Sequence, residues 1–369
     1  MLRILYHWRL ATTAGRVCVT MSTEPTDDPT PSIALETKVD FLNQPESYPE
    51  QPHRVETLET HTSWIFLTDA FAYKLKKPLC YEFLDFSTVD ARRRNCEAEV
   101  QLNRRLAHDV YLGTVPLTVQ PHDAAAMHLG SNGKVVDWLV KMRRLPSHWV
   151  LEQKIKNHTV KANDIAKVAM VLADFYEKAP PVAISPAEYH NRFVTDVCVT
   201  LNELTGPDYE LSTTWIKVIT DAQLQFLQNQ AAFFTRRVQE GRIIEAHGDL
   251  RPEHIYLGNE PIIVDCLEFN REFRILDSVD ELAFLAMECE RLAAPDIGNI
   301  LFATYRQITS DNPPHALTHF YMSYRAMLWA KLAIRHINRH GTGKRSKWIS
   351  RTEDYLHLAE NHIEQSRCH

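Results

Sequence analysis

The stretch EAHGDLRPEHIYLGNEPIIVDCLEFN, residues 245–270, places two aspartates around a short hairpin pattern. Asp249 precedes the apolar run IYL, and Asp265 follows the second apolar run, PIIV. Turn-forming residues 258–260, with the sequence GNE, separate the two runs. Because a hairpin returns the chain toward its starting edge, we expect both carboxylates to reach one edge of a cleft.

Two carboxylates in this arrangement suit phosphoryl transfer. Asp249 would orient the attacking hydroxyl and accept its proton, while Asp265 would hold Mg²⁺ against nucleotide phosphates. A single aspartate more often caps a turn, so the inference depends on the full spacing with the hairpin between. A phosphotransferase catalytic loop is usually written HxDxxxxN, and HGDLRPEH matches it except that His254 replaces the asparagine. Arg251 is a candidate for contact with the γ-phosphate.

The segment AYKLKKP, residues 72–78, supplies candidates for a phosphate-binding lysine. If it is a strand, Lys74 and Lys76 share one face and Lys77 points away. Ala72 leaves room for an adenine on that same face, which favours Lys74. A lysine that binds the phosphates and an aspartate that binds the metal contact the same nucleotide. Lys74 and Asp265 should therefore lie within about 15 Å of each other.

A helix is predicted over FSTVDARRRNCEAEVQLNRRLA, residues 86–107, opening with a capping box of Ser87 and Asp90. Glu99 lies beside the apolar stripe of this helix, whereas Glu97 projects to the other side. Glu99 is therefore the better partner for the phosphate lysine.

The sequences HGDLRPEH and IIVDCLEFN, with the lysine strand and its acidic helix, resemble the aminoglycoside phosphotransferase or choline-kinase-like family. FAYKLKKPLCYEFLDFST, NRRLAHDVYLGTVPL and VDCLEFN are more closely similar to the kinase-like half of large bacterial bifunctional aminoglycoside phosphotransferase and ATP-binding proteins. The resemblance covers roughly residues 51–340. It implies a protein-kinase-like α+β fold with ATP and Mg²⁺ between two lobes, Asp249 as catalytic base and Asp265 as metal ligand.

The chain departs from the family pattern at three places. His254 replaces a metal-binding asparagine, and an imidazole favours Mn²⁺, Co²⁺ or Zn²⁺ over Mg²⁺, so one metal, an altered metal or loss of transfer follows. THTSWIFLTD contains no glycine, so Thr62 and Ser63 would cradle the phosphates through hydroxyl and backbone groups. Met142 is a further candidate for the nucleotide pocket.

The third departure concerns a P-loop domain, into which the closer relatives continue. GTGKRS, residues 341–346, does not supply one, because Asn338 takes the place of the first glycine and Arg345 that of Ser or Thr. A separate P-loop protein is therefore a candidate partner.

The composition excludes several other classes of function. The chain has 369 residues, 44% of them apolar, and a net charge of -6 with a pI near 6.3, so no global positive field favours nucleic acid. The seven cysteines form no CxxC pair, and no apolar run approaches the roughly 20 residues that span a bilayer. We expect a reducing, cytoplasmic setting without nucleic-acid or membrane partners.

The organisation predicted from these patterns has three parts. Residues 1–53 read as a flexible leader with at most one short helix, around residues 35–42, and translation from Met21 is favoured over an organellar presequence. Residues 54–145 form a β-rich N-lobe with one helix. Helical periodicity then indicates a C-lobe over residues 146–369 that carries the catalytic loop and hairpin.

The acceptor is a small molecule that the sequence does not identify. Glu268, Glu272 and Asp280 near the proposed cleft favour a cationic one. Only eleven residues separate Asp265 from Asp277, which leaves no room for the activation loop of a protein kinase. Two alternatives stay open: a nucleotide-binding pseudokinase, and a metal-dependent hydrolase that combines His247 with the other site residues.

Overall fold

The computed structural model describes residues 33–81, 83–120, 123–130, 133–337 and 345–367. These residues divide into two compact units, one of residues 33–147 and 262–271 and one of residues 148–261 and 272–367. The first division falls after Ser147, beside the change of pattern at Pro146. The second unit is interrupted by a segment that contains Asp265 and belongs to the first.

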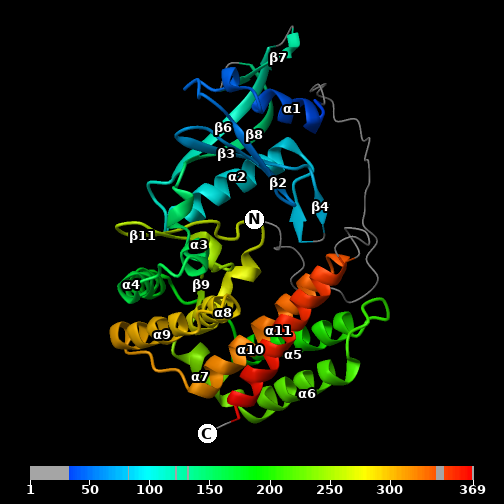
Figure 1. Ribbon diagram of the computed structural model, residues 1–369, viewed down its shortest axis with the longest axis vertical. Coiled ribbons are helices and arrows are strands. Elements are labelled where there is room, and N and C mark those ends of the chain that lie inside the picture. Colours follow the sequence, from blue (N-terminus) through cyan, green and yellow to red (C-terminus); the bar gives the residue numbers. More distant parts are fainter. Residues whose placement is uncertain (1–32, 82, 121–122, 131–132, 338–344, 368–369) are drawn as a thin grey trace. The chain divides into compact units, whose positions relative to one another are not determined.

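A six-stranded antiparallel sheet forms the centre of the first unit (Figure 1). In sheet order its strands are β1 (Glu56–Glu59), β2 (Ser63–Leu67), β3 (Phe71–Lys76), β8 (Lys134–Arg143), β6 (Tyr111–Gln120) and β7 (Asp123–Leu129). β4 (Cys80–Tyr81) and β5 (Leu84–Asp85) form a small second sheet. Aromatic and β-branched residues that favour strands, such as Phe66, Tyr73 and Val136, fill the core against the six-stranded sheet.

The helix α2 (Val89–Asn103) covers part of this sheet, because Cys96 and Val100 pack against Tyr111 and Val140. Its N-cap is Thr88, whose hydroxyl accepts the Ala91 N–H at 3.0 Å.

The capping box expected from Ser87 and Asp90 is wrong. Ser87 donates its hydroxyl to Asp85 Oδ1 at 2.6 Å, and Asp90 pairs with Arg93. The competing acceptor moves the helix start by one residue.

Residues 33–53 are part of this unit, so the leader predicted to end at residue 53 is too long. The helix α1 (Leu35–Leu42) has the predicted position, but Val39 and Leu42 lie in the sheet core. Lys38 Nζ lies 2.8 Å from Asp137 Oδ2. A buried ion pair and an apolar face thus hold this segment in place. Residues 1–32, with Met21, lie outside the described residues.

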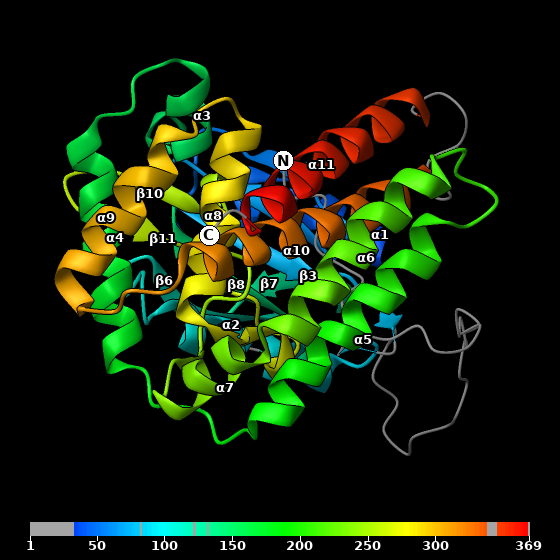
Figure 2. The same ribbon diagram turned by 90° about the horizontal axis from the view of Figure 1, so that it is seen from below.

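Helices form most of the second unit: α3 (Leu151–Lys156), α4 (Ala162–Lys178), α5 (Pro186–Leu204), α6 (Thr213–Asn229), α7 (Ala231–Gln239), α8 (Ser278–Arg291), α9 (Asp296–Thr309), α10 (His315–Ile334) and α11 (Arg345–Gln365). Figure 2 shows α10 beside α11 and α5 beside α6. β9 (Ile243–Glu245) pairs with β12 (Ile275–Asp277), and β10 (Ile255–Leu257) forms a hairpin with β11 (Pro261–Ile263). Among the described helices, none combines the length and apolar character that a bilayer-spanning segment requires.

Candidate active site

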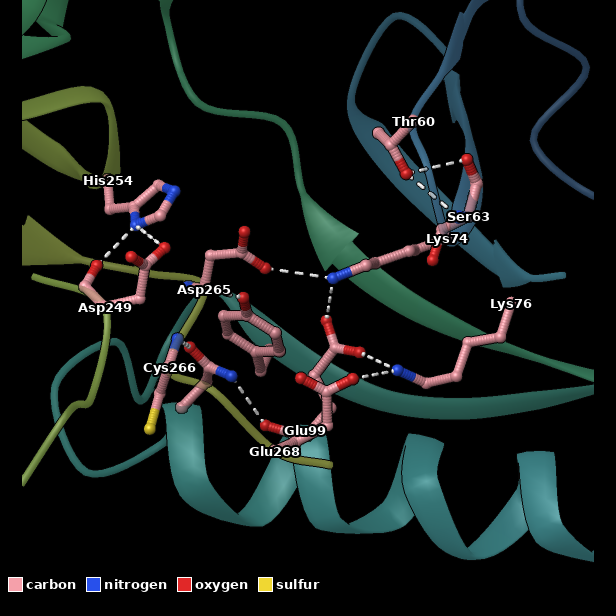
Figure 3. A network of polar contacts seen from close by, with 12 residues as sticks. Thr60, Ser63, Lys74, Lys76, Glu99, Asp249, His254, Asp265, Cys266 and Glu268 are labelled. Carbon is pink, nitrogen blue, oxygen red and sulfur yellow. Dashed lines mark hydrogen bonds and ion pairs between the residues drawn. The ribbon is translucent and has the colours of Figure 1, made fainter. Parts of the chain in front are cut away.

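Two lysines of β3 share one carboxylate of α2. Lys74 Nζ lies 2.8 Å from Glu99 Oε1, and Lys76 Nζ lies 2.7 Å from Glu99 Oε2 (Figure 3). Alternation along the strand places both lysines on one face, as the sequence predicted. Glu97 instead binds Arg93 on the exposed side of the helix.

The structure also brings Lys74 and Asp265 together, with 2.9 Å between Nζ and Oδ1, well within the predicted limit (Figure 3). Asp265 has a left-handed backbone with a φ of 63°, a conformation that aspartate tolerates better than most residues. Its N–H donates to the Tyr111 hydroxyl at 3.1 Å, and the Cys266 N–H donates to Asn103 Oδ1 at 2.8 Å. Side chains from two elements therefore fix this strained segment.

Charge pairing maintains the ionised forms of this network. Burial lowers the pKa of Lys74, but the carboxylates of Asp265 and Glu99 outweigh it and the net pKa is well above its ordinary value. Burial raises the pKa of Glu99, but Lys74 and Lys76 outweigh it and the net pKa is lowered. Lys74 is therefore an ammonium group and Glu99 a carboxylate at neutral pH.

The candidates for nucleotide contact lie on the same sheet as Lys74. Ala72 pairs across the sheet with Met142, so these two residues are adjacent on β3 and β8. The turn before β2 is organised by Thr60, whose Oγ1 accepts the Ser63 N–H and donates to the Ser63 carbonyl, both at 2.9 Å. Thr62 and Ser63 are both buried. Thr60 was missed, although Ser and Thr hydroxyls that bond nearby backbone groups are typical of turns.

The second unit contains the loop with Asp249. The Asp249 N–H donates to His247 Nδ1 at 3.3 Å, and Arg251 Nε lies 3.1 Å from Asp249 Oδ1. His254 Nδ1 lies 2.8 Å from the Asp249 carbonyl oxygen (Figure 3). A carbonyl only accepts, so Nδ1 carries the proton and Nε2 carries the lone pair that a metal would require.

Arg251, a residue of this loop, is buried. Its Nη1 lies 2.7 Å from Glu253 Oε1, and its guanidinium carbon lies 4.7 Å from the centre of the Trp329 ring. Burial lowers the pKa of Arg251, but Asp249 and Glu253 outweigh it and the net pKa is raised. These contacts favour a role in positioning Asp249 over the γ-phosphate contact that we predicted.

Glu281 of α8 binds the backbone of the loop that contains Asp249, and sequence reasoning missed it. Its carboxylate accepts the N–H groups of His247 at 3.2 Å and Gly248 at 2.6 Å, and the Tyr176 hydroxyl at 2.9 Å. Gly248 has a φ of 86°, which explains the glycine. Burial raises the pKa of Glu281, and the bonds from Gly248 and His247 oppose this rise.

Two of the acids that favoured a cationic acceptor are already neutralised. The Glu268 side chain is 6% exposed and pairs with Lys76, while Asp280 is buried and lies 2.6 Å from Arg325. Glu272 is half-exposed but pairs with Arg192 at 3.0 Å. Their charges therefore give no support for a cationic acceptor.

The described residues contain no cluster of three His, Cys, Asp or Glu side chains able to enclose a metal. Asp265 supplies an oxygen in the first unit, and His254 presents a nitrogen in the second. Mg²⁺ commonly takes one or two carboxylates and completes its shell with phosphates and water. Asp265 therefore fits a metal that arrives with a nucleotide, whereas an all-protein metal site, as a hydrolase would use, finds no support.

The chain is similar to several curated proteins of unstated activity. An uncharacterised protein of Mycobacterium bovis and one of Mycobacterium tuberculosis are each 32% identical to it over 289 residues, covering 75% of this chain and 54% of the relative. The chain therefore spans about half the length of the curated relatives it matches. No protein-family model matches it.

The comparison with solved structures defines the fold. A choline/ethanolamine kinase family protein from Mesorhizobium loti has a TM-score of 0.51 at 13% identity, over 90% of this chain and 100% of that one. An aminoglycoside phosphotransferase from Alicyclobacillus acidocaldarius has a TM-score of 0.46 at 10% identity, over 85% and 91% of the two chains. The protein has the two-lobed α+β fold of the choline/ethanolamine kinases, and the predicted fold class is confirmed.

Proposed function

We propose that the protein is an ATP-dependent phosphotransferase that acts on a hydroxyl group of a small molecule. The observation that carries the proposal is the chain of ion pairs from Glu99 through Lys74 to Asp265. Phosphoryl transfer of the kinase type needs a lysine on a strand, a helix carboxylate that orients it and an aspartate that holds the metal. The first unit contains all three in contact.

In this proposal the first unit binds the nucleotide. Lys74 contacts the phosphates, Ala72 and Met142 lie beside the adenine, and the turn at Thr62 and Ser63 lies along the phosphates. Mg²⁺ held by Asp265 supplies neutralisation of the phosphate charge. Because Thr62 and Ser63 are buried, their contribution would come through the turn backbone.

The second unit supplies the base. Asp249 accepts the proton of the acceptor hydroxyl as its oxygen attacks the γ-phosphorus, and the bond from that phosphorus to the bridging oxygen of ADP breaks. In this proposal Arg251 orients the Asp249 carboxylate, and the contact of His254 with the Asp249 carbonyl oxygen holds the loop backbone. Coordination of the metal by His254 Nε2 would shift the preferred metal from Mg²⁺ toward Mn²⁺.

A nucleotide-binding pseudokinase is the second candidate, and His254 is the observation that favours it. An imidazole in place of a metal-binding amide changes the donor from oxygen to nitrogen, which weakens a Mg²⁺ site. The base, the lysine and the metal aspartate are nevertheless all retained with their partners. These contacts favour a protein that still transfers phosphate over a pseudokinase.

A screen for ATP consumption over small hydroxyl and amine acceptors, with Mg²⁺ and with Mn²⁺, tests the choice. We expect turnover that depends on Asp249, is higher with Mn²⁺, and shifts toward Mg²⁺ by about tenfold in the ratio of rates for His254→Asn. Asp249→Ala is the matched inactive control. ATP binding without Asp249-dependent turnover for any acceptor or metal would favour the pseudokinase.

A further inference from the structure

The lysine network of the first unit contains a second ion pair that phosphoryl transfer does not require. Glu99 takes one lysine on each oxygen, and each lysine then reaches a different carboxylate (Figure 3). Lys74 binds Asp265, and Lys76 binds Glu268. Since Asp265 and Glu268 are three positions apart, β3 holds the same short segment at two points.

These two points differ in their access to solvent. The side chains of Lys74 and Asp265 are 11% and 16% exposed, whereas those of Lys76 and Glu268 are 1% and 6% exposed. The Lys76 ammonium also lies 4.8 Å from the centre of the Phe86 ring, which covers it further. A ligand can reach the first pair, but the second is enclosed by protein.

If the proposed function holds, binding of nucleotide and metal must break the exposed pair. Lys74 turns to a phosphate and Asp265 to the metal, so the groups that now neutralise each other both gain new partners. Lys74 keeps its ion pair with Glu99 as it turns toward a phosphate, but the Asp265 segment loses its contact with Lys74. A metal ligand freed in this way needs another contact to stay oriented.

We propose that Lys76 and Glu268 are positioning residues, which hold Glu99 and the Asp265 segment in place while Lys74 and Asp265 exchange partners with the nucleotide and its metal. This inference rests on the proposed function. It assigns Lys74 to the phosphates and Lys76 to the protein. Neither Lys76 nor Glu268 touches the nucleotide.

Glu268→Gln is the main test, because it removes the charge of the enclosed pair and leaves Lys76 with Glu99. Exchange of the Asp265 and Cys266 amide hydrogens, measured without ligand, should become about fivefold faster or more. The Mg²⁺ concentration for half-maximal ATP binding should rise about tenfold, with less than about threefold change in ATP affinity at saturating metal. Glu97→Gln, an exposed acid of the same region, is the matched control and should change neither.

A merely structural role would lower the Tm of Glu268→Gln without moving the metal requirement, and that result would overturn the proposal. So would unchanged amide exchange. Lys76→Met with Glu268→Gln removes both charges of the enclosed pair and leaves Glu99 with Lys74 alone, so the metal requirement should stay raised in this double variant whether its Tm lies above or below that of Glu268→Gln. If the wild-type protein fails to bind ATP with any metal, both the proposed function and the exchange of partners by Lys74 and Asp265 are wrong. The hydrogen exchange of the Asp265 and Cys266 amides would still decide whether Glu268 holds this segment in place.

Discussion

The two units hold their proposed catalytic carboxylates by different kinds of contact. In the first unit, Asp265 pairs with the ammonium group at the end of the long Lys74 side chain. In the second, Glu281 binds the backbone N–H groups of the loop that contains Asp249. A flexible lysine can change partners when a charged ligand arrives, whereas a loop fixed through buried backbone groups cannot move without exposing them.

This difference matches the two tasks of a phosphotransferase. A nucleotide and its metal must enter and leave, so the groups that bind them need partners they can exchange. A catalytic base must keep one orientation toward the acceptor, because small displacements cost rate. Single substitutions can separate an effect on the ion pair of Lys74 with Asp265 from an effect on the loop that contains Asp249.

The largest effect is expected from Asp249→Ala in the fixed loop. Loss of the base should lower kcat by about 10²- to 10⁴-fold, while the KM for ATP changes little. Steady-state kinetics with the acceptor found in the screen would measure both. A KM for ATP that rises in parallel with the loss of kcat would mean that Asp249 also binds the nucleotide, against the division drawn here.

Asp265→Ala should show the opposite pattern, because Asp265 is proposed to touch the metal. We expect ATP affinity in the presence of Mg²⁺ to fall by about 10- to 100-fold, compared with almost no fall for Asp249→Ala. Calorimetric titration of both variants, with and without metal, provides the measurement. Equal losses in the two variants would remove the proposed division of labour.

Local patterns in the sequence were sufficient to predict the pairing of Lys74 with Glu99 and to place Asp265 near Lys74. Alternation along a strand puts Lys74 and Lys76 on one face, and helical periodicity selects Glu99 over Glu97. Asp265 follows from the hairpin spacing around it. Each of these inferences needs only the geometry of one element.

The contacts that the sequence did not reveal join elements far apart in the chain. Glu281 lies 33 positions after Gly248 and occupies an apolar-looking helix, so nothing local marks it as a ligand of the loop backbone. Glu268 was read as an acid facing a cleft because its partner on β3 lies 192 positions away. The predicted N-terminus of α2 was wrong for a local reason, since Asp85 accepts the hydrogen bond of the Ser87 hydroxyl.

Glu281→Gln tests whether the loop is fixed through its backbone. A glutamine presents one oxygen and one NH₂ group where the carboxylate accepts two backbone N–H groups on its two oxygens, so one donor loses its acceptor. We expect a loss of about 1–3 kcal/mol in the free energy of unfolding and a lower kcat with an unchanged KM for ATP. Denaturant unfolding and steady-state kinetics measure these quantities. Wild-type kinetics in the variant would show that the backbone contact is not needed for the base.

The smallest effect is expected from a histidine cluster of the second unit, which should make the stability of the protein depend on pH. This dependence must be told apart from any effect of pH on the ion pairs of Lys74. His319 Nδ1 lies 2.9 Å from His362 Nδ1, and His319 Nε2 lies 3.0 Å from His315 Nε2. His362 Nε2 in turn lies 3.0 Å from Glu290 Oε2. Burial and then the neighbouring His362 and His315 lower the pKa of His319 to about 4, although Glu290 opposes this shift.

Because this folded-state pKa lies below the ordinary value for histidine, the unfolded chain binds the extra proton first as the pH falls. Stability should therefore decrease from about pH 6.5 toward pH 4 by on the order of 1 kcal/mol after allowance for partial exposure, and the decrease should be smaller in His319→Gln. Thermal unfolding of both proteins across this range measures the difference. The result that would contradict this has two parts: His319→Gln keeps the wild-type dependence of stability on pH, and Lys74→Met makes stability less dependent on pH. The acid sensitivity would then come from the ion pairs of Lys74, which would be weaker near pH 5 than proposed above.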